Sequence, residues 1–308
     1  MDEFELIERF FVRGGETEGV VTGIGDDGAV LAPRPGYELV TVIDTLVQGI
    51  HFPFDIDASD LGYRVVAVNL SDMAAMGAQP RWMMLALTLY SADATWLAGF
   101  ANGLFAAASQ HDVALVGGDT TSGNAIVATV QLSGEIAPGK AILRSGARPG
   151  DTIYVTGFVG DASGGLELAR SGRPNDYLSR RYLRPTARLD FGRSIVGVAT
   201  AAIDVSDGLY TDLGKLLRAS GVGGELDVEK LPISAALGAA FPRQEQLGFA
   251  LSGGDDYELC FTAPADAAID SGDLPVTAIG HVTEGDELTC RAGDRVVEYA
   301  DGGYRHFQ

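Results

Sequence analysis

The sequence predicts an α+β (mixed α/β) protein of two domains. Its 308 residues exceed the usual size of a single hydrophobic core, and 46% of them are hydrophobic, which is ample for two cores. Short apolar strands alternate with helical patterns in both halves of the chain, and this alternation favours sheets covered by helices. We therefore expect an N-terminal mixed sheet with helices, followed by a C-terminal α/β domain.

The N-terminal half opens with an amphipathic helix, in which Phe4, Ile7, Phe10 and Phe11 recur at helical spacing. The following apolar runs alternate between strand and helix patterns, and Ser59 stands near the start of the longest one. They predict strands over 28–32, 38–44, 82–90, 113–117 and 125–136, and helices over 59–77 and 93–110.

The segment 137–150 contains two prolines and three glycines and has little periodicity, which makes it the best domain boundary. We expect residues 1–140 to form an N-terminal domain and residues 141–308 a C-terminal domain. In the second half the patterns predict strands over 151–157, 257–262, 276–282 and 294–299, and helices over 161–171, 189–201 and 208–219.

Composition excludes several classes of partner. The formal net charge of −20 argues against a broad surface for nucleic acid or anionic lipid, because such partners are held chiefly by lysine and arginine. Cys260 and Cys290 are the two cysteines, so neither a disulfide framework nor a zinc cluster is expected. No signal peptide or run of ~20 apolar residues is evident, and we expect a cytoplasmic protein.

Four short stretches place aspartates directly against glycines. Taken singly, each is compatible with an ordinary turn. Together they indicate metal-bridged phosphate chemistry, because glycine lets backbone amides approach a ligand and carboxylates are the hard oxygen ligands that magnesium prefers. The stretches are Gly25-Asp26-Asp27-Gly28, Gly117-Gly118-Asp119, Asp204-Val205-Ser206-Asp207-Gly208 and Gly253-Gly254-Asp255-Asp256.

Gly23–Gly28 also matches the dinucleotide fingerprint G-x-G-x-x-G. Two carboxylates in that loop would repel a bare pyrophosphate, so a magnesium loop is the better interpretation. The Asp204 loop does not match an EF-hand. An EF-hand loop has glycine at its sixth position, whereas Gly208 is the fifth residue when Asp204 is counted as the first. A Walker loop is also excluded, since Gly214-Lys215 is followed by Leu216.

Further candidates lie beside these stretches. Asp44 ends a predicted strand and His51 follows it, although a lone histidine is more often structural. Asp72 shares a largely apolar helix with Asn69, and a buried carboxylate there requires a partner, which would be a metal, a helix cap or a salt bridge. Asp119 follows a predicted strand, as a site at a strand end should.

Many ordered motifs resemble the bacterial thiamine-monophosphate kinases, which share the fold of aminoimidazole ribonucleotide synthetase. The resemblance covers nearly the whole chain. Its motifs are Gly23–Asp27, Asp44–Val47 with His51-Phe52, Asn69–Ala78, Gly117–Thr121, Arg144–Asp151, Asp204–Leu209 and Ser252–Leu259.

This resemblance implies a homodimer of two-domain subunits that transfers the γ-phosphoryl of ATP to thiamine monophosphate with several magnesium ions. It implies that residues 1–140 bind ATP and magnesium and form the dimer, and that residues 141–308 complete the site for ATP, metal and substrate. It assigns ATP contacts to Gly118, Asp119, Arg144 and Ser206, and substrate contacts to His51, Asp255 and Tyr304. Magnesium ligands would be Asp27, Asp44, Asp72, Asp119, Asp204 and Asp207. Two positions depart from the family pattern: Val42 and Ile43 stand where hydroxyl residues are frequent, and Asp255 stands where relatives carry glutamate.

The chemistry agrees with this assignment, because the attacking phosphate oxygen is already anionic and needs no general base. Catalysis then reduces to positioning and to neutralising charge. The alternatives are another ATP-using enzyme of the same fold, such as a purine-precursor cyclo-ligase, and a non-catalytic nucleotide or cation sensor. Selenophosphate synthetase fits less well, because no cysteine occurs before Cys260.

Overall fold

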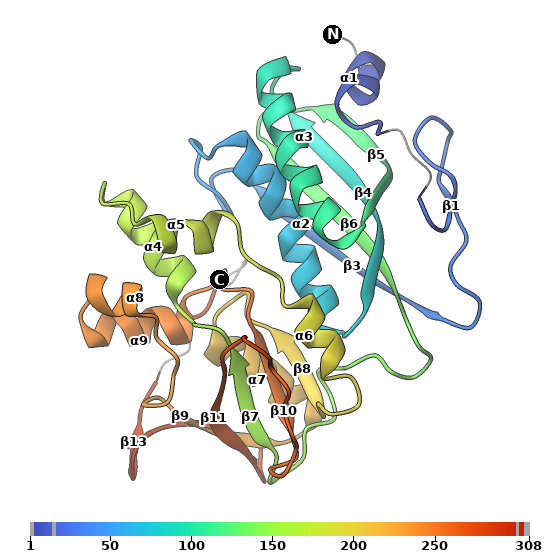
Figure 1. Ribbon diagram of the computed structural model, residues 1–308. Helices are drawn as coiled ribbons and strands as arrows, with labels where there is room; N and C mark the ends of the chain where they lie inside the picture. The colour runs from blue at the N-terminus through green and yellow to red at the C-terminus, as the bar shows by residue number, and fades with distance from the viewer. Residues whose placement is uncertain (1–2, 14–16, 300–301, 305–308) are drawn as a thin grey trace. The chain divides into compact units, whose positions relative to one another are not determined.

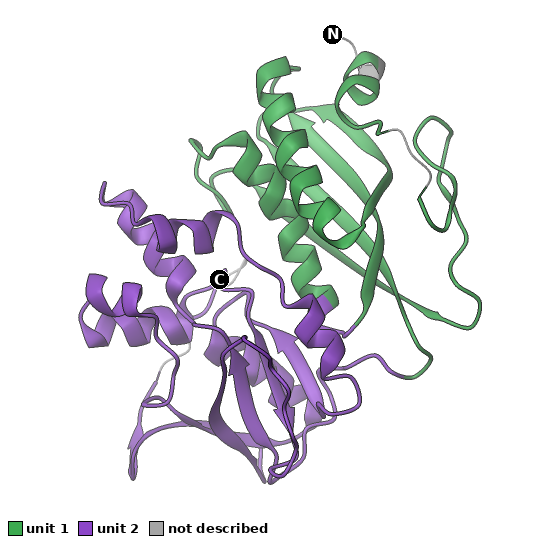
Figure 2. Cartoon of the chain, viewed as in Figure 1, with its two compact units in different colours: residues 1–73, 78–139 green, residues 74–77, 140–308 purple. Residues whose placement is uncertain are grey.

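The computed structural model describes residues 3–13, 17–299 and 302–304. The chain forms two compact units, shown in Figure 2. Unit 1 comprises Met1–Met73 and Ala78–Gly139, and unit 2 comprises Ala74–Gly77 and Lys140–Gln308. Each unit combines helices with a sheet, which confirms the predicted α+β class.

Unit 1 is built on a four-stranded sheet in the order β3-β6-β4-β5 (Figure 1). β6 pairs antiparallel with both β3 and β4, whereas β4 and β5 are parallel. A parallel pair needs a crossover, and α3 provides it. The bounds are β3 Glu38–Val47, β4 Gln79–Leu89, α3 Ala94–Ala108, β5 Ala114–Ser122 and β6 Val127–Ile136, with a separate antiparallel pair β1 Val20–Thr22 and β2 Val30–Leu31.

The two faces of this sheet differ in their covering. Val40, Leu46 and Leu132 are buried on the face covered by α2 (Ala58–Ala75) and α3 (Figure 1). Because side chains alternate along a strand, Thr41 and Ile43 point to the opposite face, and Ile43 is 63% exposed. One face of the sheet is therefore open within unit 1.

Two glycines allow α2 and α3 to cross in backbone contact. A Cβ at Gly62 would lie 2.0 Å from the carbonyl oxygen of Phe100, and one at Gly103 would lie 1.8 Å from that of Ser59. No side chain fits at either position.

At its start α3 is capped by Asp93, whose carboxylate accepts hydrogen bonds from two backbone N–H groups. The remaining helices of unit 1 are α1 Glu3–Phe10 and a 3₁₀ turn, Ser109–His111.

Unit 2 contains a seven-stranded sheet in the order β13-β12-β9-β11-β7-β10-β8. Its first strand, β7, lies between the late strands β10 and β11, and both pairs are antiparallel. Among the described strand pairs of this sheet, only β12–β9 is parallel. The bounds are β7 Thr152–Thr156, β8 Ala201–Asp204, β9 Gly223–Asp227, β10 Leu259–Ala263, β11 Val276–Thr283, β12 Leu288–Ala292 and β13 Arg295–Val297.

The core of unit 2 lies between this sheet and α7 (Leu209–Ser220). Leu213 and Leu216 of α7 are buried in one cluster with Ile153 and Cys260 of the sheet. Of the described helices, none combines the length and the apolar character needed to cross a membrane. The other helices of unit 2 are α4 Asp161–Arg170, α5 Asp176–Leu183, α6 Leu189–Ser194, α8 Ala235–Ala240 and α9 Arg243–Ser252.

One predicted helix is too long. The pattern at 189–201 predicts a single helix, but α6 ends at Ser194 and the chain turns at Gly197, where φ is +83°. Residues 201–204 then form the fully buried strand β8. A run that is apolar on every side fits a fully buried strand as well as a buried helix, so its periodicity did not distinguish the two.

Candidate functional site

In unit 1, two of the glycine–aspartate stretches line one cavity of about 700 Å³. The loop Gly23–Ala29 forms one wall, and residues 117–120 of β5 form another. The structure therefore brings Asp27, Gly118 and Asp119 to one cavity, and both aspartates are exposed.

Asp119 lies inside a strand, not beyond the end of one. β5 continues to Ser122, and a bulge leaves Val116 without a partner between Leu115 and Gly117. Gly118 follows this bulge with φ +156°, and a Cβ there would lie 1.9 Å from the carbonyl oxygen of Leu85. Gly118 thus serves the close pairing of β5 with β4, and the strand then continues past Asp119.

Asp44 also lies within its strand, because β3 continues to Val47 and Asp44 is paired with Val130. Alternation places Asp44 on the same face of the sheet as buried Val40 and Leu46, which is the face that α2 and α3 cover. Asp72 is half-buried on α2. Both carboxylates thus belong to the helix-covered side of unit 1.

Asn69, one turn before Asp72, is fully buried. Its amide nitrogen donates to the carbonyl of Val65 at 3.0 Å, while its Oδ1 accepts no hydrogen bond from the residues that the structure describes. An unsatisfied buried acceptor is costly, so this oxygen is available to a water, an ion or a ligand.

His51 lies in the turn after β3 and is half-buried. Its Nδ1 accepts a hydrogen bond from the backbone N–H of Val47 at 3.0 Å. Because Nδ1 is an acceptor, the neutral ring carries its proton on Nε2, which is then the nitrogen that can donate.

In unit 2, the other two glycine–aspartate stretches are joined by backbone hydrogen bonds. The N–H of Asp255 donates to Ser206 at 2.9 Å, and that of Tyr257 donates to Val205 at 2.9 Å. The N–H of Tyr304 donates to the carbonyl of Asp207 at 3.2 Å. Three predicted regions are therefore brought together: the Asp204–Asp207 loop, the Asp255 loop and Tyr304.

A carboxylate that the sequence did not single out organises the Asp204–Asp207 loop. Asp212, buried on α7, accepts the backbone N–H groups of Ser206 and Asp207, each at 2.9 Å. Lys215 donates to Asp212 at 2.8 Å and also to Asp207. The sequence signal was the i, i+3 spacing of Asp212 and Lys215 on the helix that follows the loop.

The electrostatics of this cluster follow from its burial. Burial raises the pKa of the Asp212 carboxyl, although Lys215 and the N–H of Asp207 act in the opposite direction. Burial also acts to lower the pKa of Lys215, but bonds to Asp207 and Asp212 outweigh it and the pKa is raised. The lysine ammonium therefore remains charged and neutralises part of the acidic loop.

A second cavity, of about 560 Å³, adjoins this loop and is lined by Asp207, Lys215, Arg218, Tyr210 and Tyr304. Arg144 does not line it. Arg144 is exposed in the segment before β7, and its carbonyl accepts a hydrogen bond from Ser220 at 3.1 Å.

Among the described residues, no group of three or more His, Cys, Asp or Glu side chains is arranged to hold a metal ion. The predicted ligands are divided between the units, with Asp27, Asp44, Asp72 and Asp119 in unit 1 and Asp204 and Asp207 in unit 2. In chemical type the set fits magnesium, because every donor is a carboxylate oxygen.

Comparison with known proteins identifies relatives of both units. Residues 25–136 match the model of the AIR synthase related protein, N-terminal domain, and residues 148–293 match that of its C-terminal domain. The thiamine-monophosphate kinase of Salmonella typhimurium is 45% identical over 99% of this chain and 98% of its own.

Two solved structures are similar over most of the chain. The crystal structure of thiamine-monophosphate kinase from Stenotrophomonas maltophilia K279a superposes with a TM-score of 0.87 at 45% identity, covering 94% of this chain and 96% of that one. A second, described as AaThiL complexed with AMPPCP and TMP, gives a TM-score of 0.81 at 33% identity and covers 92% of each chain.

Proposed function

The chain belongs to the thiamine-monophosphate kinases among the AIR synthase related proteins, and from this premise we propose how its residues serve the reaction. The enzyme transfers the γ-phosphoryl group of ATP to the phosphate of thiamine monophosphate, which gives ADP and thiamine diphosphate. The observation that carries this function is the similarity over the whole length of both units to kinases of this activity.

In the proposed site, Gly118, Asp119, Arg144 and Ser206 bind ATP. Gly118 is suited to this because it lines the cavity beside Asp119, and Arg144 is suited because an exposed guanidinium can bind phosphate with two parallel bonds. Ser206 belongs to a loop whose N–H groups are held by buried Asp212. That loop is therefore preorganised for its ligand.

His51, Asp255 and Tyr304 bind thiamine monophosphate in this proposal. His51 would donate from Nε2, because its Nδ1 already accepts from Val47. Asp255 is oriented by the hydroxyl of Tyr257, which donates to its Oδ1 at 3.0 Å. No general base is required, because the attacking phosphate oxygen is anionic near neutral pH.

We propose that several magnesium ions are held by Asp27, Asp44, Asp72, Asp119, Asp204 and Asp207. When bound, they would neutralise the charge of the phosphate groups during transfer. Lys215 already provides one positive charge beside Asp207 in unit 2. The aspartates hold and orient, and none of them needs to exchange a proton.

We further propose that the enzyme is a homodimer that works in the cytoplasm. The open face of the unit 1 sheet supports the dimer, because Leu39, Ile43 and Met84 are 54%, 63% and 37% exposed there. The free thiols of Cys260 and Cys290 are compatible with a reducing compartment. Light scattering during gel filtration would measure the oligomeric state directly.

The function is tested by supplying ATP, magnesium and thiamine monophosphate and measuring ADP and thiamine diphosphate. We expect both products in equal amounts. Turnover of a purine-pathway amidine without thiamine diphosphate would overturn the assignment. His51→Ala serves as the site test: it should raise the KM for thiamine monophosphate and leave the KM for ATP unchanged.

A further inference from the structure

The loop that carries Asp255 has an unusual backbone. Asp255 has φ +70° and Tyr257 has φ +52°, and among the described residues only one other non-glycine residue, Asp112, has a positive φ. L-residues avoid this conformation, so the surrounding structure must hold the loop in it. The two left-handed residues alternate with Asp256 and Glu258, which are fully buried.

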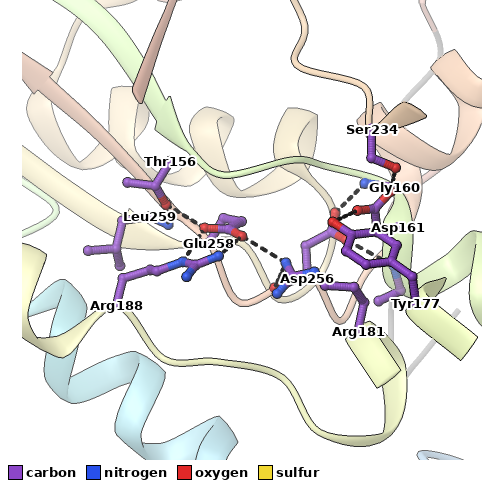
Figure 3. Close-up of polar contacts among 11 residues, drawn as sticks. Thr156, Gly160, Asp161, Tyr177, Arg181, Arg188, Ser234, Asp256, Glu258 and Leu259 are labelled. Atoms are coloured by element: carbon purple, nitrogen blue, oxygen red, sulfur yellow. Dashed lines mark hydrogen bonds and ion pairs between the residues drawn. The ribbon is translucent and has the colours of Figure 1, made fainter. Parts of the chain in front are cut away.

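The two buried acids, one inside this turn and one directly after it, anchor the loop (Figure 3). Asp256 accepts the backbone N–H groups of Gly160 at 2.6 Å and Ala162 at 3.2 Å, at the start of α4. Glu258 accepts from Thr156 Oγ1 at 2.6 Å and from Arg188, whose Nε and Nη2 lie 2.6 and 2.5 Å away. Neither acid lines the unit 2 cavity beside the Asp204–Asp207 loop.

Arg181, on α5, makes a different contact from that of Arg188. One nitrogen, Nη2, donates both to the backbone carbonyl of Asp256 at 3.0 Å and to Oε1 of Glu258 at 2.7 Å (Figure 3). Its side chain is 11% exposed. Arg181 therefore bridges the residues before and after Tyr257, whereas Arg188 donates to Glu258 alone among the residues that the structure describes.

We propose that Arg181 is a positioning residue for thiamine monophosphate, because it clamps the left-handed Asp255–Tyr257 turn in the shape that presents the Asp255 carboxylate. This inference rests on the proposed contact of Asp255 with the substrate. Arg181 itself touches neither substrate nor ATP in this role. It acts through the Asp256 carbonyl and the Glu258 carboxylate.

If Arg181 only stabilised the fold, its replacement would change the KM for both substrates or for neither. The test therefore measures the KM for thiamine monophosphate and the KM for ATP separately. The test compares Arg181→Lys with Arg180→Lys, a matched control on the same helix whose side chain is exposed and makes none of these contacts. Lysine keeps the positive charge beside Glu258 but has a single nitrogen on a flexible stem, which cannot reproduce the fixed guanidinium geometry.

Two readouts decide the outcome. Losing one charge-assisted hydrogen bond should raise the KM for thiamine monophosphate at least about tenfold in Arg181→Lys, while the KM for ATP stays within about twofold. Hydrogen exchange of the Asp255–Glu258 amides, measured without any ligand, should become faster by a similar factor. Arg180→Lys should match the wild type in both measurements.

Unchanged exchange and unchanged KM in Arg181→Lys would overturn the proposal, and so would an equal rise in both KM values. Failure of the proposed function is recognised separately, because the wild type would then form no thiamine diphosphate. The exchange measurement would still decide whether Arg181 holds the turn. Arg181→Gln, checked by circular dichroism, provides a second variant if the lysine variant does not fold.

Discussion

Replacing Glu258 by glutamine should destabilise unit 2 strongly. The Glu258 carboxylate is fully buried and accepts four hydrogen bonds, from Thr156, Arg181 and both donors of Arg188. Glutamine has one acceptor oxygen, and its NH₂ group would face a guanidinium donor. Removing one partner from a buried ion pair costs about 3–5 kcal/mol, because it leaves buried charge without compensation.

At about 2–4 °C per kcal/mol for a domain of this size, the midpoint of unit 2 unfolding should fall by roughly 6–20 °C. Calorimetry and urea denaturation of the full chain would measure the change. Glu225→Gln is the matched control, since Glu225 pairs with Arg291 at 3.4 Å and both side chains are about one-third exposed. That variant should lose less than about 1 kcal/mol. A Glu258→Gln protein within about 1 kcal/mol of the wild type would refute the reasoning.

Three further perturbations test other parts of the molecule. Asp72→Asn should lower kcat at least about 100-fold with an unchanged melting temperature; near-normal turnover would remove Asp72 from the metal site. Gly118→Ala should cost about 1–3 kcal/mol and raise the KM for ATP, because its Cβ would meet the carbonyl of Leu85 at 1.9 Å. Burial raises the pKa of Cys290 to about 11, so its thiol stays protonated at neutral pH. Alkylation of the native protein should accelerate about tenfold per pH unit below that value, whereas a plateau near pH 8.5 would contradict this pKa.

Long periodic elements were predictable from the sequence. The helices predicted at 59–77 and 93–110 are α2 (Ala58–Ala75) and α3 (Ala94–Ala108), because a wide apolar face repeats over several turns. Shorter elements such as α5 and α8 were missed, since eight and six residues offer little periodicity. The fold class followed from the alternation of elements, which does not depend on their exact ends.

The candidate site was predictable only where it is local in sequence. The glycine–aspartate stretches could be read directly, and the structure brings Asp27 to the cavity of Asp119 and joins Asp255 to the Asp204–Asp207 loop. The clamp between Arg181 and Glu258 joins residues 77 positions apart, so no local pattern announces it. Asp119 was placed at a strand end because a bulge cannot be read from the two glycines alone.

The strand order of unit 2 has a consequence for how the chain is made. β7 is the first strand of unit 2 to emerge from the ribosome, yet both of its partners, β10 and β11, come near the end of the chain. The unit 1 sheet, by contrast, is complete once Ile136 has been synthesised. At ~5–20 residues per second, β7 waits on the order of 10 s for its neighbours. During that time both of its hydrogen-bonding edges are open, so a nascent chain stalled before β10 would be prone to aggregate through β7.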